Sequence, residues 1–570
     1  MKRLTLLSLL ALVGCSFDSE LMLPTIDNSC GGSSDCSEGV CDANICIDDS
    51  GASVDLAIEV LRGSTDPEVV TPASWAFAGE SASGASSRDL VLPATRQVLG
   101  TVRWAGARVP ATLRFVRRMN DEVSSLAPVA IEVETLREPA EGYDFNAVLV
   151  AGATYDLVVM PSSDMVMLFG QEPAPAIRAL PPSYMVLQVD DGDTSEPFRF
   201  DVSFPISLAI DCTDSRDVGC TLHADVYSRD DENQVELPEA GLQVRAIDKQ
   251  SGRVVSSIAE TDATGHFAIR VSDEASDYLI RVTSSSGGAP FPSVSVDPDL
   301  VFLNNPVDKV IYIPRLEPIQ FTGQVHDKLG RAVPGATVRF LSTGIFGGSQ
   351  LGLAGSFNGS AMTNDDGSFS AELLTGFYSI SVTPPEDIQN NWGVLSADAA
   401  VGEELTTLGT LIVPSRIGLG GTVSTFRDEP AAGVTVLARA RSTTDPGAVH
   451  RSREAVSSDL GDFAMSVDVG LYDMQVKVPA ESGFSWLVEP ELAMSLNTGD
   501  LRKEYRLQPP VAVYGVIQSS DGKAVQNALV RGYVFDGGAS ATDRPLQVAE
   551  ALSGEDGSYR LLIAPRFGGE

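Results

Sequence analysis

Three short sequence signals recur in the same order along the second half of this chain, and they constrain its fold more than any other feature. The first signal is an apolar residue, then a small residue two positions later, then Val or Ile two positions after that. Its small residues are Ala224, Gly323, Gly421 and Gly515, separated by 99, 98 and 94 residues. Because a solenoid repeat spans only roughly 20–45 residues, this longer period indicates whole domains, each with its own core.

The other two signals predict what these domains are made of. A small-residue turn, as at residues 334–338, leads into alternating apolar and polar residues, and an acidic turn, as at residues 364–369, ends in Gly and an aromatic residue. Period-two alternation is typical of strands with one buried face, and the Gly of such a turn takes a positive φ. We therefore predict an all-β chain of tandem, Ig-like β-sandwiches with almost no helix.

The spacing of the signals divides the 570 residues into successive units. The predicted units are a divergent β-sandwich at 51–200, three sandwiches at 201–313, 314–413 and 414–508, and an incomplete one at 509–570. The last unit departs from the pattern, because a Tyr follows nine residues after Phe369 and Phe463, whereas Gly568 stands nine residues after Tyr559. Either the last sandwich is truncated or another segment covers its open edge, since a bare edge strand invites aggregation.

The first residues have the features of a secretory signal. Lys2 and Arg3 precede an apolar run at 4–13 that is too short to span a bilayer, and Cys15 follows a small residue. This junction resembles a bacterial lipobox, which implies that residues 1–14 are removed and that acylated Cys15 anchors the protein to a membrane. Ser16 follows where Asp favours inner-membrane retention in that family, so we expect the outer membrane. The alternative is an ordinary secretory signal with a chance Cys.

The remaining six cysteines suit an oxidising compartment. Four of them lie within a polar stretch of the segment 15–50, which we predict to be a lipid tether followed by a Cys-rich knob; these are Cys30, Cys36, Cys41 and Cys46. Two disulfides would hold this stretch compact, although their connectivity is open. The rival is a four-thiolate zinc site, which usually has closer Cys pairs. Cys212 and Cys220 flank a polar loop that a third disulfide would close.

Composition and motifs argue against several classes of function. The excess of 77 acidic over 40 basic residues gives a net charge of -37, which excludes nucleic acid as a partner. The only histidines, which fall in different predicted domains or repeat positions, are His223, His266, His326 and His450. No catalytic, metal or cofactor motif occurs, so we predict no enzyme and no cofactor.

Two further groups of residues have a structural and a functional interpretation. The acidic clusters at 190–193 and 364–367 could be fragments of calcium loops, but turn capping is favoured because neither continues into a complete loop. Four tryptophans could form a carbohydrate platform, but their isolation favours core or interdomain packing. They are Trp75, Trp104, Trp392 and Trp486.

Together the three signals resemble the carboxypeptidase regulatory-like domain over most of residues 218–570. That family's closing signal, Gly-x-Tyr before alternating apolar residues, occurs at residues 376–378 and 470–472. The resemblance implies a transthyretin-like sandwich of about seven strands with an accessory character. It brings no active site, because the zinc peptidase domain of those relatives is absent from this chain. A similar pilin-type domain carries a Lys–Asn cross-link, but no opening strand here contains the required Lys.

These observations lead to an expected function. We expect a non-catalytic, lipid-anchored protein of the cell envelope, whose serial β-sandwiches act as a stalk or a binding array. Its partners would be the membrane, through Cys15, and an envelope protein or glycan that the sequence does not identify. The alternative is an accessory or sensor component of an envelope peptidase, polysaccharide or transport system.

Overall fold

The structure is a computed structural model of the whole chain. It describes residues 28–565 with the exception of 32–35, 37–38, 49, 52, 63–70, 105, 119–125, 127–128, 137–141, 163–179, 193, 205–220, 231–234, 273–276, 285–292, 299–309, 315–317, 346–353, 387–389, 403–404, 442–450, 498 and 536–544. Cys15, Cys212, Cys220 and His450 therefore lie outside the described residues. Within the described residues, no helix has both the length and the apolar character of a membrane span.

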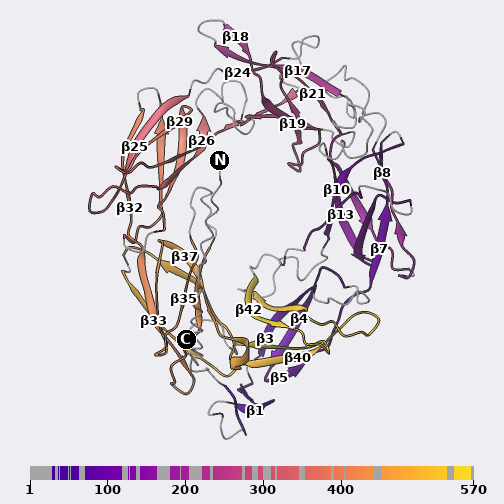
Figure 1. Ribbon diagram of the computed structural model, residues 1–570, viewed down its shortest axis with the longest axis vertical. Helices are drawn as coiled ribbons and strands as arrows, with labels where there is room; N and C mark the ends of the chain where they lie inside the picture. The colour runs from indigo at the N-terminus through magenta and orange to yellow at the C-terminus, as the bar shows by residue number, and fades with distance from the viewer. Residues whose placement is uncertain are drawn as a thin grey trace, which may run out of the picture.

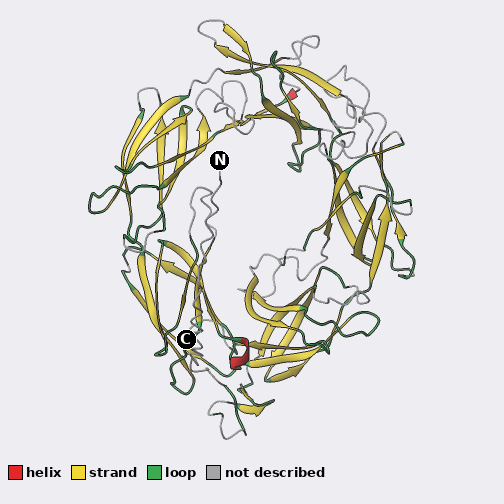
Figure 2. Ribbon diagram, viewed as in Figure 1, coloured by secondary structure: helices red, strands yellow, loops and turns green. Residues whose placement is uncertain are grey.

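Five β-sandwiches follow one another around a ring, and strands account for nearly all of the regular structure (Figures 1 and 2). The predicted all-β fold class is confirmed. The sandwiches are numbered here by their order around the ring, starting after residue 94. The first comprises β7 (Thr95–Gly100), β8 (Val102–Trp104), β9 (Ala107–Arg108), β10 (Ala111–Arg117), β11 (Ile131–Glu134), β12 (Phe145–Val150), β13 (Thr154–Pro161), β14 (Ser183–Gln188), β15 (Phe198–Arg199) and β16 (Val202–Phe204).

The next three sandwiches correspond to the predicted repeats. The second comprises β17 (Thr221–Asp230), β18 (Val235–Pro238), β19 (Leu242–Asp248), β20 (Ala259–Glu260), β21 (His266–Arg270), β22 (Tyr278–Ser284), β23 (Ser293–Val296) and β24 (Val310–Pro314). The third comprises β25 (Ile319–Asp327), β26 (Thr337–Ile345), β27 (Ala354–Ser356), β28 (Asn358–Met362), β29 (Ser368–Leu373), β30 (Gly376–Thr383), β31 (Leu395–Val401) and β32 (Thr407–Val413). The fourth comprises β33 (Ile417–Thr425), β34 (Thr435–Ala440), β35 (Arg453–Val456), β36 (Asp462–Val467), β37 (Gly470–Lys477), the 3-10 helix η6 (Ala480–Ser482), β38 (Leu487–Met494) and β39 (Leu501–Leu507).

The fourth sandwich shows the strand order that the others repeat. One sheet has the order β36-β33-β39, in which the last strand runs parallel to the opening strand β33. The facing sheet has the order β35-β34-β37-β38. Alternate residues are buried along β34, whereas β37 buries residues 472–476 in succession, and apolar side chains of both sheets meet in one core between them. The acidic turns close as predicted, and Gly461 has a φ of 76°.

The fifth sandwich combines the two ends of the described chain. Its C-terminal strands are β40 (Val511–Gln518), β41 (Leu529–Phe535), β42 (Pro545–Leu552) and β43 (Ser558–Ile563), which match the first four strands of the repeat. The remaining strands come from β3 (Ser53–Leu61), β4 (Ser74–Ser83), β5 (Ala85–Ser87) and β6 (Leu90–Val91). β3 pairs with β41 as β37 pairs with β34, and β5 and β6 run parallel to β40 as β39 does to β33.

This arrangement differs from the expectation that residues 51–95 belong to the first sandwich. Alternate residues Val54, Leu56, Ile58 and Val60 of β3 lie in one core with residues of β40 to β43. The open edge of residues 509–570 is therefore covered by another segment of the chain. The sequence identified 54–61 as a strand, but local alternation says which face of a strand is buried and not which distant strand it joins.

A close backbone approach holds the N-terminal strands against β40. A Cβ added at Gly515 would stand 1.9 Å from the carbonyl oxygen of Arg88, and the amide of Arg88 donates to the carbonyl of Tyr514 at 2.7 Å. The same close approach occurs in the fourth sandwich, where a Cβ added at the equivalent Gly421 would stand 1.8 Å from the carbonyl oxygen of Lys503 in β39. Glycine is needed at these two positions because a neighbouring strand passes directly over them.

The Gly515→Val substitution is expected to expel β5 and β6 from the fifth sandwich. The clash with the Arg88 carbonyl should lower the free energy of unfolding of this sandwich by about 3 kcal/mol. Hydrogen exchange should accelerate in residues 53–61 and 85–91 although the substitution lies far away in sequence. Gly421→Val is the matched control, and it should accelerate exchange in residues 417–507 only. Unchanged protection of residues 53–91 in the Gly515→Val protein would contradict the shared sandwich.

Candidate functional site

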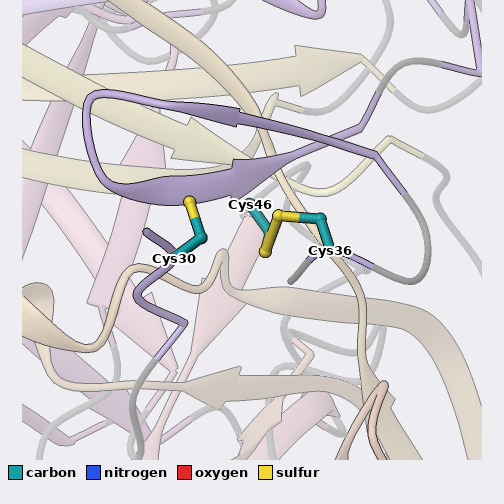
Figure 3. A group of neighbouring side chains, drawn as sticks. All are labelled: Cys30, Cys36 and Cys46. Atoms are coloured by element: carbon teal, nitrogen blue, oxygen red, sulfur yellow. A yellow bond between two sulfur atoms is a disulfide. The ribbon is translucent and has the colours of Figure 1, made fainter. Parts of the chain in front are cut away.

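The Cys-rich segment forms a small disulfide-bonded hairpin, here called the knob (residues 28–48). Strands β1 (Val40–Asp42) and β2 (Ile45–Ile47) pair through a two-residue turn, in which Ala43 and Asn44 have positive φ. Disulfides join Cys30 to Cys41 and Cys36 to Cys46, and the pair Cys36–Cys46 is drawn in Figure 3. With so few apolar residues of its own, the segment depends on these bonds to stay compact.

The positions of the cysteine sulfurs in the knob can be compared with the alternative prediction of a four-thiolate zinc site. The sulfur atoms of Cys30, Cys36 and Cys46 lie within 4.8 Å of one another, which is close enough for shared ligation. All of these sulfurs are in disulfides in the structure, so none is a thiolate that could bind a metal. The three sulfurs are close because two disulfides pack side by side in a short segment.

The knob packs against the fourth sandwich. The backbone amide of Asn28 donates to the carbonyl of Ser482 at 2.9 Å, and its side-chain amide donates to the carbonyl oxygens of Cys46 at 3.0 Å and Gly483 at 2.9 Å. Asn28 is fully buried, so these bonds satisfy donors that would otherwise be costly. The cysteines Cys30, Cys36 and Cys46 lie in the same apolar cluster as Phe426 and Phe484.

The knob also packs against the fifth sandwich. Ile45 and Ile47 form a small apolar cluster with Ala512 of β40, and the backbone amide of Asp48 donates to the carbonyl of Pro510 at 2.9 Å. The knob therefore lies across the boundary between the fourth and fifth sandwiches. The predicted knob is a brace between two domains, which its polar sequence alone did not indicate.

Three of the four tryptophans contact a neighbouring sandwich, and the fourth, Trp392, lies in the core of the third sandwich. The guanidinium of Arg117 in the first sandwich lies 4.1 Å from the ring centroid of Trp75 in the fifth, and that of Arg270 in the second lies 5.8 Å from Trp104 in the first. Trp486 of the fourth sandwich forms a bridge to Ile563 of the fifth. This agrees with the interpretation of the tryptophans as core or interdomain packing, and cation–π contacts of this kind stabilise by about 0.5–2 kcal/mol.

The second and third sandwiches are joined by backbone pairing instead. β23 of the second sandwich pairs with β27 of the third in an antiparallel ladder, so that one sheet continues across the boundary. The backbone groups that pair here would otherwise form an exposed sheet edge.

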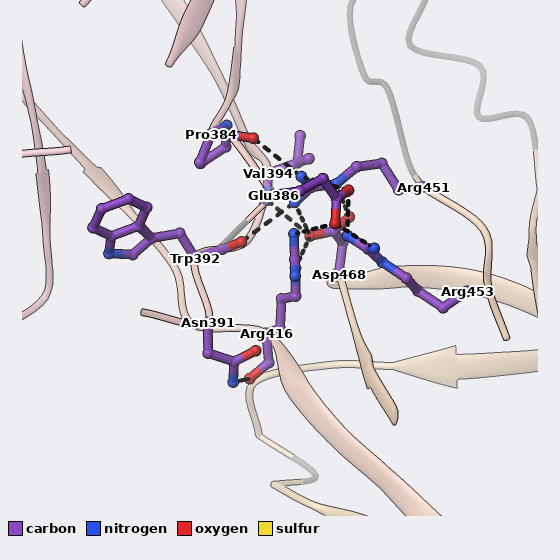
Figure 4. A network of polar contacts seen from close by, with 9 residues as sticks. All are labelled: Pro384, Glu386, Asn391, Trp392, Val394, Arg416, Arg451, Arg453 and Asp468. Atoms are coloured by element: carbon purple, nitrogen blue, oxygen red, sulfur yellow. Dashed lines mark hydrogen bonds and ion pairs between the residues drawn. The ribbon is translucent and has the colours of Figure 1, made fainter. Parts of the chain in front are cut away.

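Ion pairs between charged side chains connect the third and fourth sandwiches. We call the five residues that form them the junction cluster (Figure 4). They are Glu386, Arg416, Arg451, Arg453 and Asp468. Arg451 donates through Nε and Nη2 to both carboxylate oxygens of Asp468 at 3.0 Å. Arg453 donates to both oxygens of Glu386 at 2.5 and 2.7 Å, and Glu386 belongs to the third sandwich.

Asp468 connects the two sandwiches directly. Its side chain is fully buried, and its Oδ1 accepts a hydrogen bond of 3.1 Å from the backbone amide of Val394 in the third sandwich. Arg451 reaches back across the same boundary, donating to the carbonyl oxygens of Pro384 at 3.1 Å and Trp392 at 3.3 Å. The Arg451–Asp468 pair belongs to the fourth sandwich, and its hydrogen bonds to Pro384, Trp392 and Val394 cross to the third, which fixes the relative orientation of the two.

The junction cluster changes the acidity of its own members. Burial alone would raise the pKa of Asp468, but the hydrogen bond and charge of Arg451, the Val394 amide and the charge of Arg416 hold that pKa below its ordinary value. Burial, followed by repulsion from Arg451 and Arg453, lowers the pKa of Arg416. A carboxylate whose pKa is depressed stabilises the fold above its unfolded pKa and loses this contribution as the pH falls through its folded value.

The other predicted candidates take up simple roles. Asp190 pairs with Arg96 and accepts the amide of Gly192 at 3.2 Å, and Asp366 accepts the amide of Ser368 at 2.9 Å, so one carboxylate of each acidic cluster caps a turn. Two of the histidines lie close together, although they occupy different repeat positions in the sequence. His223 and His266 stack with ring centroids 5.9 Å apart on neighbouring strands, where His266 Nδ1 lies 2.7 Å from Asp225.

Comparison with known proteins finds only distant structural similarity. No family model and no curated protein matches the chain. Among solved structures, it is similar to a streptococcal ancillary pilin, with 13% identity over 57% of this chain and 99% of the pilin at a TM-score of 0.21. It is similar to the minor pilin of Streptococcus agalactiae (13% identity, 34% of this chain, 96% of the pilin, TM-score 0.21) and to the TIE protein of Bacillus anthracis (6% identity, 73% of this chain, 74% of that chain, TM-score 0.16). At these TM-scores the similarity carries no conclusion about function.

Replacing Asp468 by Asn should loosen the boundary between the third and fourth sandwiches. The substitution leaves Arg416 and Arg451 buried without their carboxylate, which should lower the free energy of unfolding by about 3–5 kcal/mol. Chemical denaturation measures the loss. Asp398→Asn, at an exposed carboxylate of the third sandwich, is the matched control and should stay within about 0.5 kcal/mol of the parent.

The same carboxylate predicts a pH dependence. Because the folded pKa of Asp468 is below its unfolded value of roughly 4, the contribution of Asp468 is complete at neutral pH and is lost as the pH falls below that value. The protection factor of the Val394 amide, which is the intrinsic exchange rate at that pH divided by the observed rate, should therefore fall on acidification in the parent protein. In Asp468→Asn it should be low throughout. An identical pH profile in both proteins would show that ionisation of Asp468 does not cause the pH dependence.

A third prediction concerns the redox state of the cysteines. Mass spectrometry of the mature chain should find no free thiol among Cys30, Cys36, Cys41, Cys46, Cys212 and Cys220, and the knob should give the linkages 30–41 and 36–46. Stoichiometric zinc on the first four cysteines would contradict this prediction.

Proposed function

We propose that this protein is a non-catalytic scaffold of the cell envelope, anchored to the outer membrane through acylated Cys15. In this proposal its sandwiches form a rigid ring that presents a binding surface, instead of a flexible stalk. The observation that carries the proposal is the fifth sandwich, in which β3 to β6 complete β40 to β43 and so join the two ends of the chain.

The boundaries between domains support rigidity. Domains on flexible linkers normally move relative to one another unless their interface is large or specific. Here successive boundaries contain cation–π contacts at Trp75 and Trp104, a shared sheet between β23 and β27, and the junction cluster. The knob braces the fourth boundary. Each of these devices fixes an angle between neighbouring sandwiches, which is what a scaffold requires.

The charge of the protein limits the kind of partner. With a net charge of -37, the surface repels polyanions, so the proposed partner is an envelope protein or a neutral or cationic glycan. The resemblance of residues 218–570 to carboxypeptidase regulatory-like domains is part of this proposal, since those domains are accessory modules. The seven strands of the fourth sandwich, β33 to β39, support this resemblance, which implies about seven strands.

A second candidate function is an accessory or sensor component of an envelope peptidase, polysaccharide or transport system. It rests on the accessory character that the family resemblance implies. The two candidates differ in partner, because a sensor has one enzyme or transporter as its partner whereas a scaffold binds structural components. Co-purification from crosslinked envelopes, followed by mass spectrometry, separates the two.

The anchoring part of the proposal is tested by Cys15→Ser. This substitution should abolish labelling with a radioactive or clickable fatty acid and release the protein into the soluble fraction, because the acyl chains supply the membrane affinity. Ser16→Asp is the matched control, which should keep the label and shift the protein to the inner membrane. A labelled Cys15→Ser protein would contradict lipid anchoring and would leave the ring unaffected.

A further inference from the structure

The junction cluster has more positive than negative charge. Among its described residues, the guanidinium groups of Arg416, Arg451 and Arg453 face only the carboxylates of Asp468 and Glu386. This excess stands out in a chain whose net charge is -37. Burial is the largest cause of the lowered pKa of Arg416; repulsion from Arg451 and Arg453 lowers it further, and the charges of Asp468 and Glu386 act in the opposite direction.

The cluster also contains donors without acceptors. The side chain of Arg416 is only 6% exposed, yet its Nε and Nη2 lack a hydrogen-bond acceptor within the described part of the chain, as does Nε of Arg453. The nearest carboxylate oxygens to Arg416 belong to Asp468 at 3.5 Å and Glu386 at 3.9 Å, where they act as ion-pair partners only. Buried donors are nearly always satisfied in native proteins, by protein, water or an ion.

We propose that the junction cluster binds one small inorganic anion, such as chloride or phosphate, between the third and fourth sandwiches. The anion accepts hydrogen bonds from Arg416 and Arg453 and offsets the excess positive charge. A water molecule would accept the same hydrogen bonds but would leave the repulsion among three guanidinium groups in place. Charge-assisted hydrogen bonds to an anion are roughly twice as strong as neutral ones.

The site belongs to both domains. Glu386 is 60% exposed, whereas Arg416 Nε and Nη2 and Arg453 Nε are covered, so an anion reaches these donors when the exposed Glu386 side chain moves aside. Glu386 comes from the third sandwich, Arg416 from the connection between the sandwiches, and Arg453 from the fourth. An anion bound here therefore holds the two sandwiches in one orientation, and its concentration sets the stiffness of this part of the ring.

The test uses the full-length protein in salts of equal ionic strength. Sodium gluconate, whose anion is too bulky for the cluster, is compared with sodium chloride and sodium phosphate. Hydrogen exchange at the Val394 amide, which bonds to Asp468, should slow roughly tenfold when the small anion reaches about ten times its dissociation constant. Equal exchange rates in gluconate, chloride and phosphate would overturn the proposal and indicate water at the site.

Two variants show whether the effect arises at the cluster. Arg416→Met retains most of the side-chain volume and removes the unmet donors, so it should abolish the difference between the salts. Arg531→Met is the matched control, because Arg531 pairs with Glu550 on the fifth sandwich, and it should keep the difference. A salt effect that persists in Arg416→Met would assign the effect to another place and overturn the site.

A structural measurement decides the proposal even if Arg416→Met fails to fold. Crystals of the unmodified protein grown with bromide in place of chloride should give an anomalous scattering peak within hydrogen-bond distance of Arg416 Nε or Nη2. Absence of a peak there, with bromide bound elsewhere or nowhere, would overturn the proposal.

Discussion

Backbone pairing between β3 and β41 is the interaction on which the rest of this structure depends. It joins segments from opposite ends of the described chain, and the hydroxyl of Tyr533 donates to Glu59 at 2.9 Å across 474 residues of sequence. Without it, the last sandwich would expose an unpaired strand and the part of its apolar core that the N-terminal strands cover. With it, a string of sandwiches becomes a closed ring, because both ends of the string are held in the same domain (Figure 1).

Closure of the ring requires every other boundary between sandwiches to have a defined geometry. The angles between successive sandwiches must add up so that β3 reaches β41, and loose boundaries would make that meeting entropically costly. The boundaries accordingly contain specific contacts, of which the buried Asp468 and its arginines are the most constrained. A buried ion pair contributes little net stability, but it fixes geometry because any misalignment leaves a charge unpaired. The knob also fixes geometry, because the buried side-chain amide of Asn28 bonds both to the knob and to the fourth sandwich.

Much of the fold, but little of the candidate site, could be predicted from the sequence. The repeated signals predicted the sandwiches because strand alternation and Gly turns such as that at Gly461 are local properties. The missing closing strand after Tyr559 was also visible, yet its replacement by 54–61 was not, since strand pairing is set by a partner hundreds of residues away. Asp468 and the stacked pair of His223 and His266 lacked any local signal, because their partners come from other strands or domains.

Ring closure is tested most directly by a cross-strand disulfide between β3 and β41. Glu59 and Arg531 are partners in the strand register, so Glu59→Cys and Arg531→Cys place two thiols opposite each other. We predict that the double variant, at low protein concentration, forms this disulfide within one chain. Mass spectrometry should find the linked peptide, and a non-reducing gel should show a monomer. Free thiols at both positions, or linkage only between two chains, would contradict the closed ring.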